Sequence, residues 1–137
     1  MLYSKIYERL YSLKGKTAKT TGEFFSFWPN RLYLGMIVLI QAASWWLSYS
    51  IFKNTSDNLL VLHYNVNFGI NWIGDGNLIF YFPFLSLVFL LLALLVIFIF
   101  GVGRHFRISC HYLMGGTLIS NLGVFLAILL IYIINFK

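Results

Sequence analysis

The sequence predicts an all-α membrane protein with three transmembrane helices, an N-terminal amphipathic surface helix and a partly extended outer loop between the first two spans. Sixty per cent of the 137 residues are hydrophobic and 10% are charged, whereas a soluble domain carries roughly 25% charged residues. Three apolar runs, 32–52, 78–102 and 112–136, are each long enough to cross a bilayer, which takes about 20 helical residues. We therefore expect a single membrane domain over 1–137.

The residues before the first span divide into two parts. Residues 1–13 place apolar side chains at positions 2, 3, 6, 7, 10 and 11, which is a helical spacing. Half of these are tyrosines, which favour the headgroup layer, so we expect an amphipathic helix on the membrane surface, with a frayed terminus as the alternative. Residues 14–31 are expected to form a basic and aromatic linker. Its first part, 14–23, contains two glycines and three lysines, which predict a flexible, exposed segment. The aromatic cluster at 24–30 contains Pro29, which favours a break before the next helix.

The placement of Lys and Arg predicts the orientation. With three spans, the N-terminal segment and the turn at 103–111 lie on the same side, and they hold all ten Lys and Arg residues except Lys53 and Lys137. We therefore expect a cytoplasmic N-terminus, with the C-terminus and the loop at 53–77 outside. We therefore expect the net charge of +6 to attract anionic lipid headgroups rather than nucleic acid. The residues expected to meet headgroups are Lys5, Arg9, Arg31, Arg104 and Arg107.

The outer loop holds a patterned polar stretch. Residues 62–72 alternate between apolar and polar side chains when Gly69 is counted as polar, which is typical of a half-buried strand. A lone strand leaves its backbone groups unpaired. The stretch can fold back with a turn around residues 67–69, form an irregular loop held by its Asn side chains, or pair with another chain. The residues expected to contact a partner here are His63, Tyr64, Asn65, Asn67, Gly69, Asn71 and Trp72.

Small residues recur inside the spans. The third span has them at a heptad-like spacing that permits close helix approach: Gly116, Ser120, Gly123 and Ala127. The first span has Gly35 and Ala42, and the second has Ser86 and Ala93. We expect these faces to meet one another or a partner helix.

Among the polar residues inside the predicted spans, we single out Gln41, Ser44 and Asn121, of which Gln41 and Asn121 lie near mid-span. Polar groups in hydrocarbon need partners, so we expect interhelical hydrogen bonds, with a substrate or ion path as the alternative. The sequence lacks the paired carboxylates, Gly-rich phosphate loop, nucleophile elbow and HExxH motif of common enzymes. His105, Cys110 and His111 do not have the spacing of a zinc site. We expect no enzymatic activity, no cofactor and no metal.

Residues 62–71 resemble the His-aromatic-Asn…Gly element that follows the first span in small bacterial membrane proteins of the SdpI-type immunity group. The match covers His63, Tyr64, Asn65 and Gly69, with one span before the element and one after it. The resemblance implies a multi-pass protein of the bacterial cytoplasmic membrane and implies no enzymatic activity.

We expect a non-enzymatic accessory or scaffold subunit of a larger bacterial membrane complex. Its partners would be membrane lipids and other membrane protein subunits, in a hetero- or homo-oligomer. One alternative is a membrane immunity or stress protein, as the resemblance implies. Another is an oligomeric small transporter or channel, with Gln41 and Asn121 lining its path.

Overall fold

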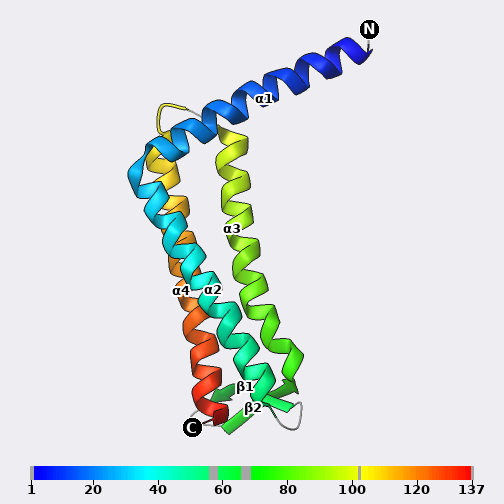
Figure 1. Ribbon diagram of the computed structural model, residues 1–137, viewed down its shortest axis with the longest axis vertical. Helices are drawn as coiled ribbons and strands as arrows, with labels where there is room; N and C mark the ends of the chain where they lie inside the picture. The colour runs from blue at the N-terminus through cyan, green and yellow to red at the C-terminus, as the bar shows by residue number, and fades with distance from the viewer. Residues whose placement is uncertain (1, 56–58, 66–68, 102, 137) are drawn as a thin grey trace.

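The computed structural model describes residues 2–55, 59–65, 69–101 and 103–136, which form a bundle of long helices with a β-hairpin at one end (Figure 1). In chain order the elements are α1 (Leu2–Ser26), α2 (Trp28–Asn54), β1 (Leu59–Asn65), β2 (Gly69–Asp75), the 3₁₀ helix η1 (Gly76–Phe80), α3 (Tyr81–Phe100) and α4 (Phe106–Phe136).

Three helical segments are long and apolar enough to cross a membrane: Trp28–Asn54, Gly76–Ile99 and Phe106–Phe136. They confirm the prediction of three spans. The helices α2 and α4 lie side by side and run in the same direction, and α3 runs antiparallel to both (Figure 1). Pro83 lies near the start of α3, where its missing N–H costs least.

The expectation of a linker over residues 14–31, flexible in its first part, is wrong, because α1 runs without interruption to Ser26. Each glycine inside a helix costs about 1 kcal/mol relative to alanine, but contacts with the bundle offset this cost. The Lys16 ammonium donates a hydrogen bond to the carbonyl oxygen of Ile99 at 3.0 Å, Thr20 is fully buried, and Phe24 is only 2% exposed. The helix ends at an extended Phe27 (φ −87°, ψ 106°), just before Pro29 in the first turn of α2.

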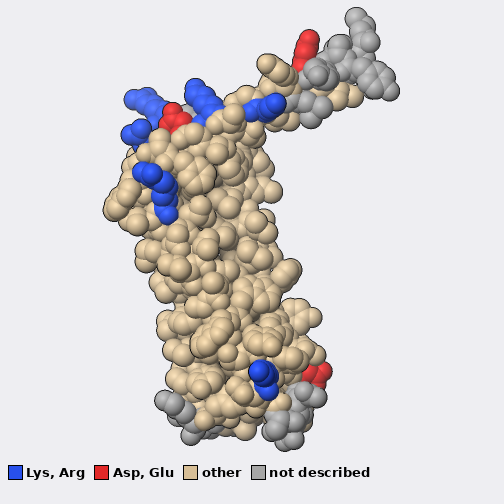
Figure 2. Space-filling model, in the orientation of Figure 1, with Lys and Arg blue, Asp and Glu red and all other residues tan. Residues whose placement is uncertain are grey.

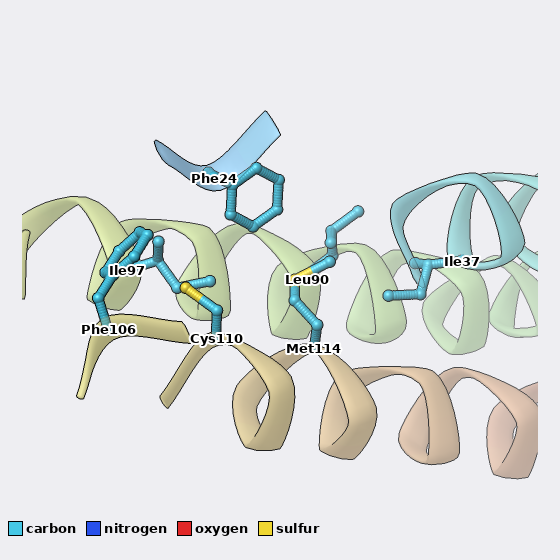
Figure 3. Packing of buried hydrophobic residues seen from close by; sticks show 7 residues of the cluster. All are labelled: Phe24, Ile37, Leu90, Ile97, Phe106, Cys110 and Met114. Atoms are coloured by element: carbon cyan, nitrogen blue, oxygen red, sulfur yellow. The ribbon is translucent and has the colours of Figure 1, made fainter. Parts of the chain in front are cut away.

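Two apolar clusters hold the bundle together. The first lies near the end that α1 crosses, and its buried members come from all four helices (Figure 3): Phe24, Ile37, Leu90, Ile97, Phe106, Cys110 and Met114. The second lies at the hairpin end: Leu47, Ile51, Leu60, Leu62, Ile79, Ile128 and Ile131. The hairpin therefore shares a core with the spanning helices.

Charge is concentrated at the two ends of the molecule. Lys and Arg side chains gather over α1 and the adjacent helix ends, and the flank of the bundle visible in Figure 2 is uncharged. The spanning helices also carry many exposed aliphatic and aromatic residues, such as Leu39 (72% exposed) on α2 and Leu92 (52% exposed) on α3. An uncharged apolar flank between charged ends suits a bilayer, since charges are costly at its centre.

Candidate functional site

The β-hairpin is built from the stretch whose alternation stands out in the sequence. The strands β1 and β2 pair antiparallel, with Leu60 opposite Gly74 and Tyr64 opposite Ile70. Residues directly opposite each other in such a pair share a face. In these two pairs, even-numbered residues of the two strands share a face. The register is irregular around His63, which pairs with Trp72.

The apolar face of β1 is packed against the bundle. Leu60 is fully buried and Leu62 is 7% exposed, and both belong to the second apolar cluster. Gly74 on β2 makes this packing possible: a Cβ placed there would lie 2.5 Å from Leu78 Cδ1 and 2.8 Å from Leu62 Cδ1. Such distances are closer than van der Waals contact, so a side chain at position 74 would require the Leu78 and Leu62 side chains to move.

Asn135, near the end of α4, binds the outer edge of β1. Its Oδ1 accepts a hydrogen bond from the backbone N–H of Val61, and its Nδ2 donates to the carbonyl oxygen of Val61, both at 2.9 Å. The same Nδ2 also donates to the carbonyl oxygen of Ile131 at 2.8 Å. Asn135 thus occupies the two backbone groups that a neighbouring strand would use at this residue. The sequence analysis did not single out Asn135; its signal was a polar amide in the last turn of an apolar run.

The second strand presents apolar side chains to the outside. Ile70 and Trp72 are each 53% exposed, and Ile73 is 55% exposed. Next to Trp72 lies an apolar groove of about 460 Å³. It is lined by Leu62, Trp72, Leu78, Tyr81, Phe82 and Leu85. Exposed apolar side chains beside an apolar groove are typical of a protein or lipid contact.

The other residues of the predicted contact segment lie mostly along the two strands. Asn67 lies outside the described residues. Tyr64, Asn65 and Asn71 are placed as strand residues, and Gly69 begins β2 with a positive φ of 76°, which favours glycine. His63 is exposed. Among the described residues no group of three or more His, Cys, Asp or Glu side chains could hold a metal ion.

A polar layer separates the two apolar clusters. On each spanning helix, buried polar residues fall between the buried members of one cluster and those of the other. They are Gln41 and Ser44 on α2, Ser86 on α3, and Thr117 and Asn121 on α4. Two further buried polar residues of α2, Asn30 and Ser48, lie outside this layer.

Gln41 joins two helices of this layer. Its Nε2 donates to the carbonyl oxygen of Pro83, and its Oε1 accepts from Ser86 Oγ, both at 2.6 Å. Asn121 instead donates to Thr117 in its own helix at 3.0 Å, and Ser44 donates to the carbonyl oxygen of Ile40. The interhelical bond expected of these residues is therefore present at Gln41, while Asn121 Oδ1 has no hydrogen-bond partner among the described residues.

The small-residue faces do not meet one another as a set. On α4, Gly116, Ser120 and Gly123 are exposed and Ala127 is half-buried, because the opposite side of the helix carries Met114, Asn121 and Ile128 toward the bundle. On α2, Gly35 and Ala42 are likewise exposed, whereas Ser86 and Ala93 on α3 are buried. Of the two expectations for the α4 stripe, contact with a partner helix is the one left open.

The described basic residues of the predicted headgroup set lie at the α1 end of the bundle. Arg31, Arg104 and Arg107 are exposed. The guanidinium carbon of Arg107 lies 5.8 Å from the centre of the Phe27 ring, within the range of a cation–π contact. Lys5 and Arg9 belong to α1, and their side chains lie outside the described residues.

The comparisons with known proteins give no relative. No protein-family model, no curated protein and no solved structure matches this chain.

Proposed function

We propose that the chain is a non-enzymatic accessory or scaffold subunit of a bacterial membrane complex, and that it docks a partner on β2 and the adjoining groove. It would lie in the cytoplasmic membrane with its N-terminus inside, its amphipathic α1 on the inner surface and the hairpin outside, as the excess of Lys and Arg at the α1 end favours. The exposed small-residue stripe of α4 offers a second contact, to a neighbouring helix.

The observation that carries this proposal is the difference in burial between the two strands. β1 is buried against the bundle through Leu60 and held at its edge by Asn135, whereas β2 leaves Ile70, Trp72 and Ile73 about half exposed. Because β1 is fixed to the bundle, the paired strand β2 offers a rigid edge on which a partner can dock. Since little conformational freedom would be lost there on binding, a rigid edge favours affinity.

Purification from native membranes in mild detergent tests the proposal. We expect one protein to co-purify in fixed stoichiometry and to be lost on Trp72→Ala. The matched control is Trp28→Ala, because Trp28 is similarly exposed (61%) but stands at the start of α2, at the opposite end of the bundle. A monodisperse monomer with no co-purifying protein would overturn the proposal, as would equal loss from both variants.

A further inference from the structure

A cavity of about 540 Å³ opens between the end of α3 and the start of α4. This volume falls in the range of pockets that hold small ligands, about 300–1,000 Å³. Gly101, Gly103 and His105 line the end of the cavity nearest α1, which we call its mouth. Farther along the two helices the lining includes Val96, Ile97 and Leu113. The lining at the mouth is therefore more polar than the lining between the helices.

The apolar part of the cavity lies along membrane-spanning segments and has a fixed floor. Val96 and Ile97 belong to the span Gly76–Ile99, and Leu113 to the span Phe106–Phe136. Ile97, Phe106 and Cys110 line the cavity and are also buried members of the first apolar cluster, where they lie close together (Figure 3). A hydrocarbon chain in this cavity would rest on packed core rather than on mobile side chains.

Lys16 places a positive charge at the mouth. Its Nζ donates to the carbonyl oxygen of Ile99 at 3.0 Å, which leaves two of the three ammonium protons for another acceptor. Gly101 admits the lysine stem: a Cβ at this position would lie 2.5 Å from Lys16 Cε, and the φ of Gly101 is 64°. The cation also compensates the partial negative charge at the end of α3.

The charge balance at the mouth is positive. Arg104 is exposed and stands between Gly103 and His105, which both line the cavity. The next carboxylate after Lys16 along α1 belongs to Glu23, seven residues on, which is about 10 Å of helix. An anion at the mouth would therefore meet Lys16 and Arg104 before any acidic group of α1.

From this arrangement we infer that the cavity binds one anionic phospholipid of the leaflet at the α1 end. An acyl chain lies in the apolar part between α3 and α4, and the phosphate lies at the mouth near Lys16, Arg104 and His105. Basic pockets between spanning helices are a general device for holding anionic headgroups. Ser109 and Tyr112, which follow His105 at helical spacing on the cavity side of α4, border the path between headgroup and chain.

Native mass spectrometry of the purified full-length chain tests this inference. The chain is titrated with phosphatidylglycerol and, in parallel, with zwitterionic phosphatidylcholine. We expect tighter binding of phosphatidylglycerol, weakened roughly five-fold by Arg104→Gln, as the loss of one headgroup-facing charge implies. Ser109→Trp fills the cavity from its wall and should abolish selective binding.

Two control variants separate a site from general surface charge. Arg107→Gln removes the same charge three residues away, but the Arg107 guanidinium rests on the Phe27 ring, so binding should be unchanged. Ile119→Trp introduces the same side chain at an exposed position of α4 outside the cavity, where binding should be unchanged. Equal loss with Arg104→Gln and Arg107→Gln would overturn the inference, as would full binding by Ser109→Trp.

Discussion

Two amide side chains fix neighbouring segments to the bundle in different ways. Gln41 joins α2 to α3 through the Pro83 carbonyl and Ser86. Asn135 joins α4 to the edge of β1 through both backbone groups of Val61. Each amide uses a donor and an acceptor at once, and replacing either would leave polar groups of its neighbours without a partner, which is the costly outcome.

We expect Asn135→Ala to free the edge of β1. The Val61 N–H and C=O would lose their partner, at a cost of about 1–3 kcal/mol. Amide hydrogen exchange in detergent micelles should therefore accelerate at Val61. Asn77→Ala is the control, because Asn77 is an exposed asparagine of η1. Unchanged exchange at Val61 in Asn135→Ala would contradict the role assigned to this bond.

Replacing the buried amides of the polar layer should have opposite effects. Gln41→Leu removes the α2–α3 bond and should destabilise the bundle by roughly 0.6–2 kcal/mol. Asn121→Leu removes an amide that donates only within its own helix and whose Oδ1 has no partner among the described residues, so stability should be equal or higher. Unfolding in mixed micelles measures both. Loss of stability in Asn121→Leu would show that this side chain has a partner beyond the described contacts.

At the scale of secondary-structure elements, α1 is held to the bundle by the second half of its length. Lys16, Thr20 and Phe24 recur every four residues on one face, and this face meets the end of α3 and the first apolar cluster. The first half of α1 projects past the bundle (Figure 1). Its Ile6 and Leu13 lie on the same face, seven residues apart, and are about half exposed.

We expect Phe24→Ala to release α1. Phe24 is 2% exposed within the first apolar cluster, and truncating a buried Phe typically costs about 3–5 kcal/mol. Trypsin should then cleave faster after Lys14, Lys16 and Lys19 in the reconstituted protein. Phe25→Ala is the matched control, since the adjacent Phe25 is 46% exposed. Equal cleavage of the two variants would contradict the docking of α1 through Phe24.

The sequence predicted elements where periodicity is local and missed those that depend on tertiary contact. Composition and length were sufficient for the three spans. The helix through residues 14–26 could not be predicted, because its two glycines and β-branched threonines are poor helix formers; the contacts of Lys16 and Phe24 that offset this are far away in sequence. Likewise, alternation marked residues 62–72 as extended, but the bond from Asn135 joins residues 74 positions apart.

For the whole molecule, the orientation in the membrane is the property that decides which side the hairpin faces. With Cys110 replaced by Ala, we expect Lys53→Cys to react with a membrane-impermeant maleimide in intact cells. Arg104→Cys should react only after permeabilisation. Both positions are exposed and lie at opposite ends of the bundle, so the reverse labelling pattern would invert the proposed topology.

The sequence alone does not determine which face of each spanning helix packs against the bundle. The small-residue stripe of α4 and the buried face with Asn121 alternate along the same helix, and both are compatible with helix packing. Only the packing of α4 against α2 and α3 decides which of them turns inward. Among the described residues, Gln41 has an interhelical hydrogen-bond partner and Asn121 does not, although both were predicted to need one.

The length of α1 has a consequence for the shape of the surrounding bilayer. A helix of 25 residues is about 37 Å long and 10–12 Å wide. In the surface location proposed for it, α1 adds cross-sectional area to one leaflet, while the hairpin at the other end has no such projecting helix (Figure 1). A molecule wider in one leaflet than in the other acts as a wedge, and inserted amphipathic helices are sensitive to curvature. The protein should therefore concentrate where the leaflet that holds α1 is convex.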